Sequence, residues 1–178
     1  MKIFISGGCK NGKSYYAQRL AAEQGARPLY YIATMKPADS EDDERILRHR
    51  KEREGWGFIT VEQPENIGGI LNKCDPDGSF LLDSLTALLA NEMFRASGEA
   101  DDMAAGNIVD GLARVLDRTA NIVLVSDYIY SDAAIYDPLT EKYRESLAKI
   151  DRAMAARCDT VLEITYSGVI THKHGGVV

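Results

Sequence analysis

Short apolar runs alternate with longer segments of helical periodicity along this chain. The runs are rich in β-branched and aromatic residues and lie at 2–6, 28–33, 58–62, 79–83, 121–126 and 160–165. Residues 80–82 and 122–125 are apolar at every position, which is typical of strands buried on both faces of a sheet. The alternation predicts an α/β fold in which helices flank a mostly parallel sheet.

Helical periodicity predicts helices at 13–24, 40–54, 84–96, 102–119 and 138–157. Pro138 suits the first turn of the last of these helices. After the turn at Tyr166-Ser167-Gly168, we expect residues 169–172 to return as an antiparallel strand at the edge of the sheet. The loop 64–77 has room for one short helix. With 178 residues and no internal repeat, residues 1–178 are expected to form a single domain.

The composition excludes several classes of function. Lys and Arg number 21 against 27 Asp and Glu, and no basic tail is present, so we expect no nucleic-acid partner, and an anionic membrane surface would have to be met by a local patch. Cys9, Cys74 and Cys158 lie far apart, without zinc-ligand or disulfide-framework spacing. No stretch approaches the ~18 apolar residues of a membrane span, and the apolar start is too short for a signal peptide, which predicts a cytoplasmic protein.

The strongest chemical signal is a complete G-x-x-x-x-G-K-[ST] motif between the first predicted strand and the first predicted helix. It reads Gly7-Gly8-Cys9-Lys10-Asn11-Gly12-Lys13-Ser14. In this context the backbone N–H groups surround a nucleotide phosphate, Lys13 neutralises the β- and γ-phosphates, and the Ser14 hydroxyl holds Mg²⁺. The motif predicts a nucleotide-binding P-loop domain of the RecA-like kind. A tight strand-to-helix turn without a ligand is the alternative.

Asp83 ends the apolar strand expected at 79–83, about 70 residues after the P-loop. A P-loop fold places at such a position an acidic residue that binds the metal through water, so we expect Asp83 to join Ser14 at the Mg²⁺ site. The alternative is that Asp83 caps the helix that follows.

The expected helix at 40–54 has few apolar residues and no stripe that would bury it in a core. Arg45, His49 and Arg53 follow at i, i+4 and i+8, which places an imidazole between two guanidinium groups on one face. Such a face suits a triphosphate that His49 attacks as a nucleophile. The alternative is a solvated face whose acidic-then-basic order complements the helix dipole.

Further segments follow the P-loop in a particular order. They are Tyr31-Ile32-Ala33-Thr34, then Asp39 and Glu41, Arg45-Ile46, His49-Arg50 and Trp56, and later Leu81-Leu82-Asp83-Ser84-Leu85-Thr86 with Asn91. This order resembles the adenosylcobinamide kinase / adenosylcobinamide-phosphate guanylyltransferase family of cobalamin biosynthesis. The resemblance extends over nearly the whole chain.

The resemblance implies two reactions on one P-loop fold. A nucleoside triphosphate, GTP or ATP, phosphorylates adenosylcobinamide, and a histidine at the position of His49 then carries GMP from GTP to adenosylcobinamide phosphate. It implies Mg²⁺ as the metal, nucleotide contacts from the P-loop, Thr34, Arg45 and Arg53, and a homotrimer in which the His49 helix faces a neighbouring subunit.

The second half of the chain departs from the family pattern. Asp127-Tyr128-Ile129-Tyr130 stands where the family has Asn-Glu-Val-Gly, and Asp151-Arg152 stands where it has Asn-Gln. In the P-loop, Lys10 stands where the family has an arginine. This replacement keeps the positive charge but loses the two parallel hydrogen bonds that a guanidinium can donate. Two other functions therefore stay open: a P-loop small-molecule kinase without guanylyl transfer, and a GTP-binding module without catalysis.

Overall fold

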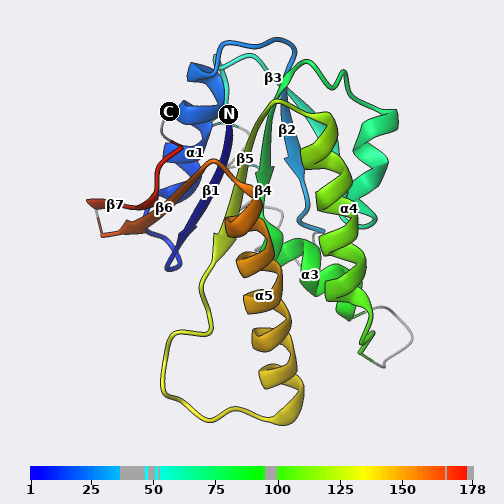
Figure 1. Cartoon of the computed structure of the whole chain (residues 1–178), viewed down its shortest axis with the longest axis vertical. Helices are drawn as coiled ribbons and strands as arrows, with labels where there is room; N and C mark the ends of the chain where they lie inside the picture. The colour runs from blue at the N-terminus through cyan, green and yellow to red at the C-terminus, as the bar shows by residue number, and fades with distance from the viewer. Residues whose placement is uncertain (37–46, 48–50, 52, 95–99, 167, 176–178) are drawn as a thin grey trace.

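Within the described part of the chain, seven strands form one sheet in the order β3-β2-β4-β5-β1-β6-β7 (Figure 1). The structure is a computed structural model and describes residues 1–36, 47, 51, 53–94, 100–166 and 168–175. The strands are β1 Lys2–Gly7, β2 Leu29–Ala33, β3 Phe58–Glu62, β4 Ser79–Asp83, β5 Asn121–Asp127, β6 Thr160–Thr165 and β7 Gly168–Lys173. All neighbours pair in parallel except β6 and β7. The expected parallel sheet and its antiparallel edge are confirmed.

The described helices follow the helical periodicity of the sequence. They are α1 Lys13–Glu23, the short 3₁₀ helix η1 Ile67–Asn72, α3 Leu85–Met93, α4 Ala104–Arg118 and α5 Pro138–Arg157. The helix expected at 40–54 lies mostly outside the described residues. Within that range Leu47 and Lys51 are described and are helical. The predicted helix continues to residue 54, but residues 53–57 form turns. Gly55 and Gly57 take positive φ angles of 88° and 78° there, which are not helical.

Two hydrophobic cores lie on opposite faces of the sheet because successive strand residues point to opposite sides. One face packs against η1, α3, α4 and α5, and buries Phe80, Leu82 and Leu124. The other packs against α1, and buries Ile5, Leu81 and Val125. Figure 1 shows α1 on one side of the sheet and α3, α4 and α5 on the other. The continuous apolar runs of β4 and β5 thus arise from burial on both faces.

The carboxyl ends of the parallel strands meet at one edge of the sheet. Gly7 at the end of β1 lies opposite Asp127 of β5, and Asp83 at the end of β4 lies opposite Val125 of β5. In Figure 1 the loop after β5 and the first turns of α5 extend beyond this edge. Ligands of open parallel sheets bind outside these strand ends, which directs the search for a site to this edge. None of the helices in the described ranges is long and apolar enough to cross a membrane.

Candidate nucleotide site

The P-loop joins β1 to α1 through backbone conformations that its sequence permits. Lys10 and Gly12 have positive φ angles of 56° and 87°, and Gly12 precedes the first residue of α1. Its lack of a Cβ removes the steric cost of this conformation. Because Gly12 has no side chain to cap the helix, the first backbone N–H groups of α1 have no side-chain acceptor at the N-cap. N–H groups at such a helix start bind phosphate.

A close approach between the P-loop and β6 requires Gly7. A Cβ on Gly7 would lie 2.6 Å from the carbonyl oxygen of Ile164 and 2.5 Å from Nδ2 of Asn11. The Asn11 side chain uses this space: its Nδ2 donates to the Ile164 carbonyl at 2.5 Å, and its Oδ1 accepts from the Lys13 N–H at 3.2 Å. Asn11 therefore fixes the loop against the sheet, while Cys9 and Lys10 are exposed at its tip.

Lys13 points back along the loop and is buried although it is charged. Its Nζ donates to the Gly8 carbonyl oxygen at 2.9 Å and forms an ion pair with Oδ1 of Asp127. A buried ammonium needs such partners, because its transfer from water costs several kcal/mol when it is unpaired. The predicted phosphate-binding amine is thus held at the carboxyl edge, beside a carboxylate.

Asp83 lies at the end of β4, as expected from the sequence. Its Oδ2 accepts a hydrogen bond from the Tyr31 hydroxyl at 3.3 Å. The cap of α3 is supplied by Ser84, whose side chain accepts from the Ala87 N–H, so the alternative role of Asp83 as helix cap is not the one observed. The Asp83 carboxylate and the Ser14 hydroxyl are the oxygen donors that Mg²⁺ prefers, and substrate phosphates ordinarily complete such a site. No cluster of three or more His, Cys, Asp or Glu that suits a metal occurs among the described residues.

Arg53 contacts Tyr31 of β2, and Tyr31 in turn contacts Asp83. Its guanidinium carbon is 3.5 Å from the centre of the Tyr31 ring, a cation–π contact with the residue that hydrogen-bonds to Asp83. Arg53 is buried, and its Nη1 has no hydrogen-bond partner among the described residues. An unsatisfied buried guanidinium donor is costly, and a phosphate or carboxylate oxygen is the group that satisfies it best.

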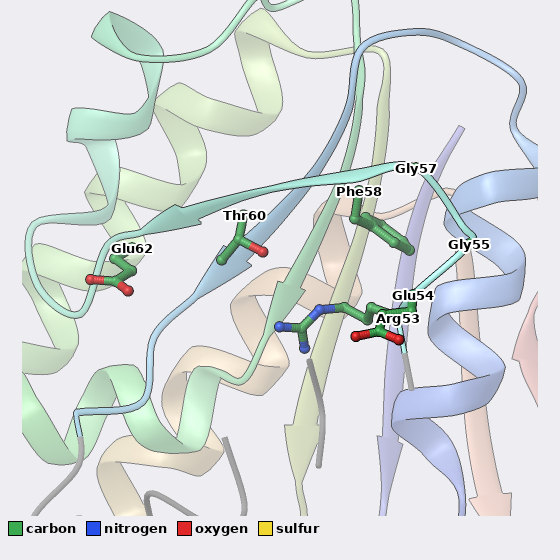
Figure 2. Close-up of a pocket in the computed structure, with 7 residues that line it drawn as sticks. All are labelled: Arg53, Glu54, Gly55, Gly57, Phe58, Thr60 and Glu62. Carbon is green, nitrogen blue, oxygen red and sulfur yellow. The ribbon is translucent and has the colours of Figure 1, made fainter. Parts of the chain in front are cut away.

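A cavity of about 740 Å³ opens beside Arg53. Its lining comes from the turn 53–57 and from β3: Arg53, Glu54, Gly55, Gly57, Phe58, Thr60 and Glu62. Figure 2 shows the Arg53 side chain extending from the turn toward the sheet, below Phe58 and Thr60. A volume of this size admits a nucleotide-sized ligand, and Arg53 supplies its positive charge.

Thr34 follows β2 and its side chain is fully buried. Its hydroxyl donates to the Ser84 carbonyl oxygen at 2.8 Å and accepts from the Ser84 N–H at 2.8 Å. The Thr34 carbonyl oxygen accepts from Nδ2 of Asn91 at 2.7 Å. The two bonds to Ser84 join the chain after β2 to the chain after β4. The Thr34 hydroxyl therefore holds the backbone next to Asp83 in place. Arg45 and His49, the other predicted nucleotide-binding and catalytic residues of the helix at 40–54, lie outside the described residues.

The sequence interpretation missed Asp127, which it treated only as a departure from a family pattern. The available signal was an acidic residue one position beyond Ser126 at the end of the apolar run 122–125, an arrangement similar to the one that pointed to Asp83. The structure brings this carboxylate to Lys13.

A second carboxyl group, Asp151 of α5, lies behind this edge. Its Oδ2 accepts from Ser126 Oγ at 3.0 Å and from the Tyr130 hydroxyl at 2.8 Å. Burial raises the pKa of Asp151 to about 6, an effect that these two hydrogen bonds oppose and the charge of Asp127 reinforces. Burial also raises the pKa of Tyr130, with Asp151 as the next cause.

Residues 3–172 match the family model described as cobinamide kinase / cobinamide phosphate guanyltransferase. The chain belongs to this family. Two curated members are similar over almost their full length. The bifunctional adenosylcobalamin biosynthesis protein CobP of Pseudomonas aeruginosa is 31% identical, with 90% of this chain and 91% of that protein covered. The protein CobU of Salmonella typhimurium is 28% identical, with 90% and 93% covered.

Solved structures share the fold of this family member at low sequence identity. The flagellar accessory protein FlaH of Methanocaldococcus jannaschii matches with a TM-score of 0.52 at 14% identity, covering 97% of this chain and 77% of that chain. A KaiC-like protein of Pyrococcus horikoshii matches with a TM-score of 0.52 at 13% identity, covering 97% and 79%. The expected family and the expected RecA-like P-loop architecture are both confirmed.

Proposed function

We propose that this chain phosphorylates adenosylcobinamide with a nucleoside triphosphate and then transfers GMP from GTP to adenosylcobinamide phosphate, giving adenosylcobinamide-GDP. The observation that carries the proposal is the complete P-loop, with Lys13 buried at the carboxyl edge, in a chain matched over residues 3–172 by the family model. Both reactions act on phosphoryl groups, and a positively charged cradle of backbone donors is what such chemistry requires.

In the kinase step the P-loop residues Gly7–Ser14 bind the phosphates of GTP or ATP. Lys13 exchanges its protein partners for the β- and γ-phosphates and stabilises the charge that develops during transfer. Ser14 and Asp83 would hold Mg²⁺, which supplies charge neutralisation between the phosphates when it is bound. The terminal hydroxyl of the cobinamide side chain is the acceptor.

In the guanylyl step His49 is the nucleophile. Its imidazole attacks the α-phosphate of GTP, the bond from that phosphorus to the β-phosphate oxygen breaks, and pyrophosphate leaves. Arg45 and Arg53 bind the phosphates around His49, and the unsatisfied Nη1 of Arg53 supports this assignment. The phosphate of adenosylcobinamide phosphate then displaces the histidine from the guanylyl group.

The proposal includes a homotrimer in the cytoplasm, in which one domain per chain binds both nucleotide and cobinamide. The sparse apolar content of residues 40–54 supports a position between subunits, where a polar helix contacts ligand and neighbour rather than a core. Sedimentation of the purified chain measures its oligomeric state directly.

A labelling experiment tests the guanylyl step. The purified chain is incubated with Mg²⁺ and GTP labelled at the α-phosphate, denatured, and assayed for retained label. We expect an acid-labile, base-stable label on the wild type and its loss in His49→Ala, because a phosphoramidate has this stability and no other side chain replaces the nucleophile.

His172→Ala is the matched control, since His172 is exposed and pairs with Glu163 on the β6–β7 edge. This variant should retain the label. Absence of label on a wild type that binds GTP would contradict the guanylyl step and leave a kinase or a binding module, which phosphate transfer to adenosylcobinamide separates.

A further inference from the structure

Asp127 is fixed at the end of β5, between the P-loop strand and the strand that carries Asp83. Its N–H donates to Oγ1 of Thr86 at 3.0 Å, and the next N–H, that of Tyr128, donates to the Gly7 carbonyl oxygen at 3.3 Å. The backbone on both sides of the Asp127 side chain is therefore held by neighbouring segments. The backbone that carries the carboxylate is thus anchored by contacts that do not involve Lys13.

The position of Asp127 relative to Lys13 defines where a transferable phosphate would lie. Lys13 of the P-loop contacts the β- and γ-phosphates of a bound triphosphate. Because Oδ1 of Asp127 forms an ion pair with the same ammonium, this carboxylate borders the space of the γ-phosphate. The Asp127 side chain is 23% exposed, so a molecule outside the sheet edge reaches it.

A carboxylate beside a phosphate is repelled unless a proton or a cation lies between them. The proposed Mg²⁺ ligands are Ser14 and Asp83, and Asp83 pairs with Val125, two residues before Asp127 along β5. Asp127 thus stands closer to the outer edge than the strand end that carries the metal carboxylate. The acceptor alcohol approaches the γ-phosphate from outside, and its O–H is a proton donor that a carboxylate attracts.

We infer that Asp127 binds the acceptor hydroxyl of the kinase step and takes its proton. This inference rests on the proposed function. The alcohol oxygen forms a bond to the γ-phosphorus, and the bond from that phosphorus to the bridging oxygen of the β-phosphate breaks. The nucleoside diphosphate leaves with the electron pair. The alcohol proton goes to the Asp127 carboxylate and then to solvent through its exposed side.

The substitution Asp127→Asn tests this role, because it keeps the size of the side chain and removes its basicity. We expect kcat for phosphate transfer from γ-labelled triphosphate to adenosylcobinamide to fall about 10²- to 10⁴-fold. Nucleotide affinity should stay equal or rise, since Lys13 no longer has a carboxylate that competes with phosphate. GMP labelling from α-labelled GTP should be unchanged, because it involves no acceptor alcohol.

Asp117→Asn is the matched control. Asp117 is exposed near the end of α4 at the opposite edge of the sheet, where it pairs with Arg157 at 3.5 Å, so this variant should keep the wild-type kcat. Asp127→Glu retains a carboxylate and is expected to transfer phosphate faster than Asp127→Asn. Thermal unfolding of each variant checks that it folds. If Asp127→Asn does not fold, the comparison of Asp127→Glu with wild type serves as the test.

Four results would overturn the inference. They are a kcat in Asp127→Asn within about threefold of wild type, a restoration of kcat by raised Mg²⁺, a loss of nucleotide affinity equal to the loss of kcat, and no gain from Asp127→Glu. The second would make Asp127 a metal ligand, and the third a structural support of the P-loop. A wild type that phosphorylates no cobinamide would instead overturn the proposed function itself.

Discussion

Asp151 is a carboxyl group buried behind the carboxyl edge of the sheet. Only 3% of its surface is exposed, and its Oδ1 has no hydrogen-bond partner among the described residues. Ser126 and Tyr130 donate to the other oxygen, while the negative charge of Asp127 further disfavours a charge on Asp151. The ionised form is therefore disfavoured in the folded protein, and the protonated form is favoured up to mildly acidic pH.

The raised pKa of Asp151 has a definite consequence for stability. From its ordinary value of 3.8 the pKa rises to about 6, so the folded chain binds this proton more tightly than the unfolded chain. The stability that this tighter proton binding contributes is fully present below the pKa of the unfolded chain. It is lost as pH rises through the pKa of the folded chain. We expect Asp151→Asn to be more stable than wild type by about 2–3 kcal/mol near pH 8, and the difference to shrink toward pH 4.

Urea unfolding of wild type and Asp151→Asn across this pH range measures the effect. Asp117→Asn again serves as control, because its exposed side chain should give a curve parallel to that of wild type. Parallel curves for Asp151→Asn as well would show that the Asp151 carboxyl group titrates alike in both states, contrary to the prediction.

At single positions, the sequence is informative where a residue type is required by local geometry. Gly7 and Gly12 belong to a motif whose conformation the structure reproduces, and Asp83 stands at its expected strand end. Asp127 and the buried Thr34 hydroxyl could not be assigned in this way. Their partners, Lys13 and Ser84, lie 114 and 50 residues away in the chain, and only the sheet order brings them together.

One side chain of α5, Arg144, contacts the loop between β5 and α5 at several points. Arg144 is buried, and its guanidinium donates to the Ile129 carbonyl oxygen at 3.0 Å, to Asp132 at 3.0 Å and to Glu141 at 2.6 Å. It also lies 4.5 Å from the centre of the Tyr136 ring. A single planar group with five donors suits this many partners, which a lysine ammonium does not.

Removal of this side chain should loosen the loop without unfolding the sheet. We expect Arg144→Ala to lose about 1–3 kcal/mol of stability and to raise amide hydrogen exchange across residues 129–136. Mass spectrometry of the exchanged peptides measures it.

Arg157→Ala is the control for Arg144→Ala, because the Arg157 side chain lies at the far end of α5 in an exposed ion pair with Asp117 at 3.5 Å. Its exchange in residues 129–136 should match wild type. Equal protection of these residues in Arg144→Ala and wild type would mean that the loop holds its conformation without Arg144.

Secondary-structure elements were predictable where one physical signal dominates. β3, β4, β6 and α5 have the expected bounds, and the antiparallel strand differs by one residue at each end. α3 begins one residue later than expected because Ser84 is its N-cap and not its first helical residue. α4 begins at Ala104, two residues later, since Asp101 accepts from the Met103 N–H and forms a turn there.

For the whole molecule, nucleotide binding and folding are linked through Lys13. A ligand that binds only the folded chain stabilises it by RT ln(1 + [L]/Kd), about 2.7 kcal/mol at 100 times Kd. We expect GTP with Mg²⁺ to raise the unfolding midpoint of wild type and to leave that of Lys13→Ala almost unchanged.

Lys149→Ala is the matched control for this experiment, because Lys149 is exposed on α5 and outside the site. Differential scanning calorimetry at several GTP concentrations measures the midpoints. A GTP-dependent shift in Lys13→Ala as large as in wild type would contradict a P-loop role for this lysine.

The place of β1 between β5 and β6 has a consequence for the order of events during synthesis. The P-loop leaves the ribosome first, yet Asn11 needs the Ile164 carbonyl and Lys13 needs Asp127. A nascent chain that ends before residue 121 lacks both strands that pair with β1, and one that ends before residue 160 has β5 but still lacks β6. The first-made motif is thus the last to become functional, and premature termination yields fragments that bear the phosphate-binding sequence without the ability to use it.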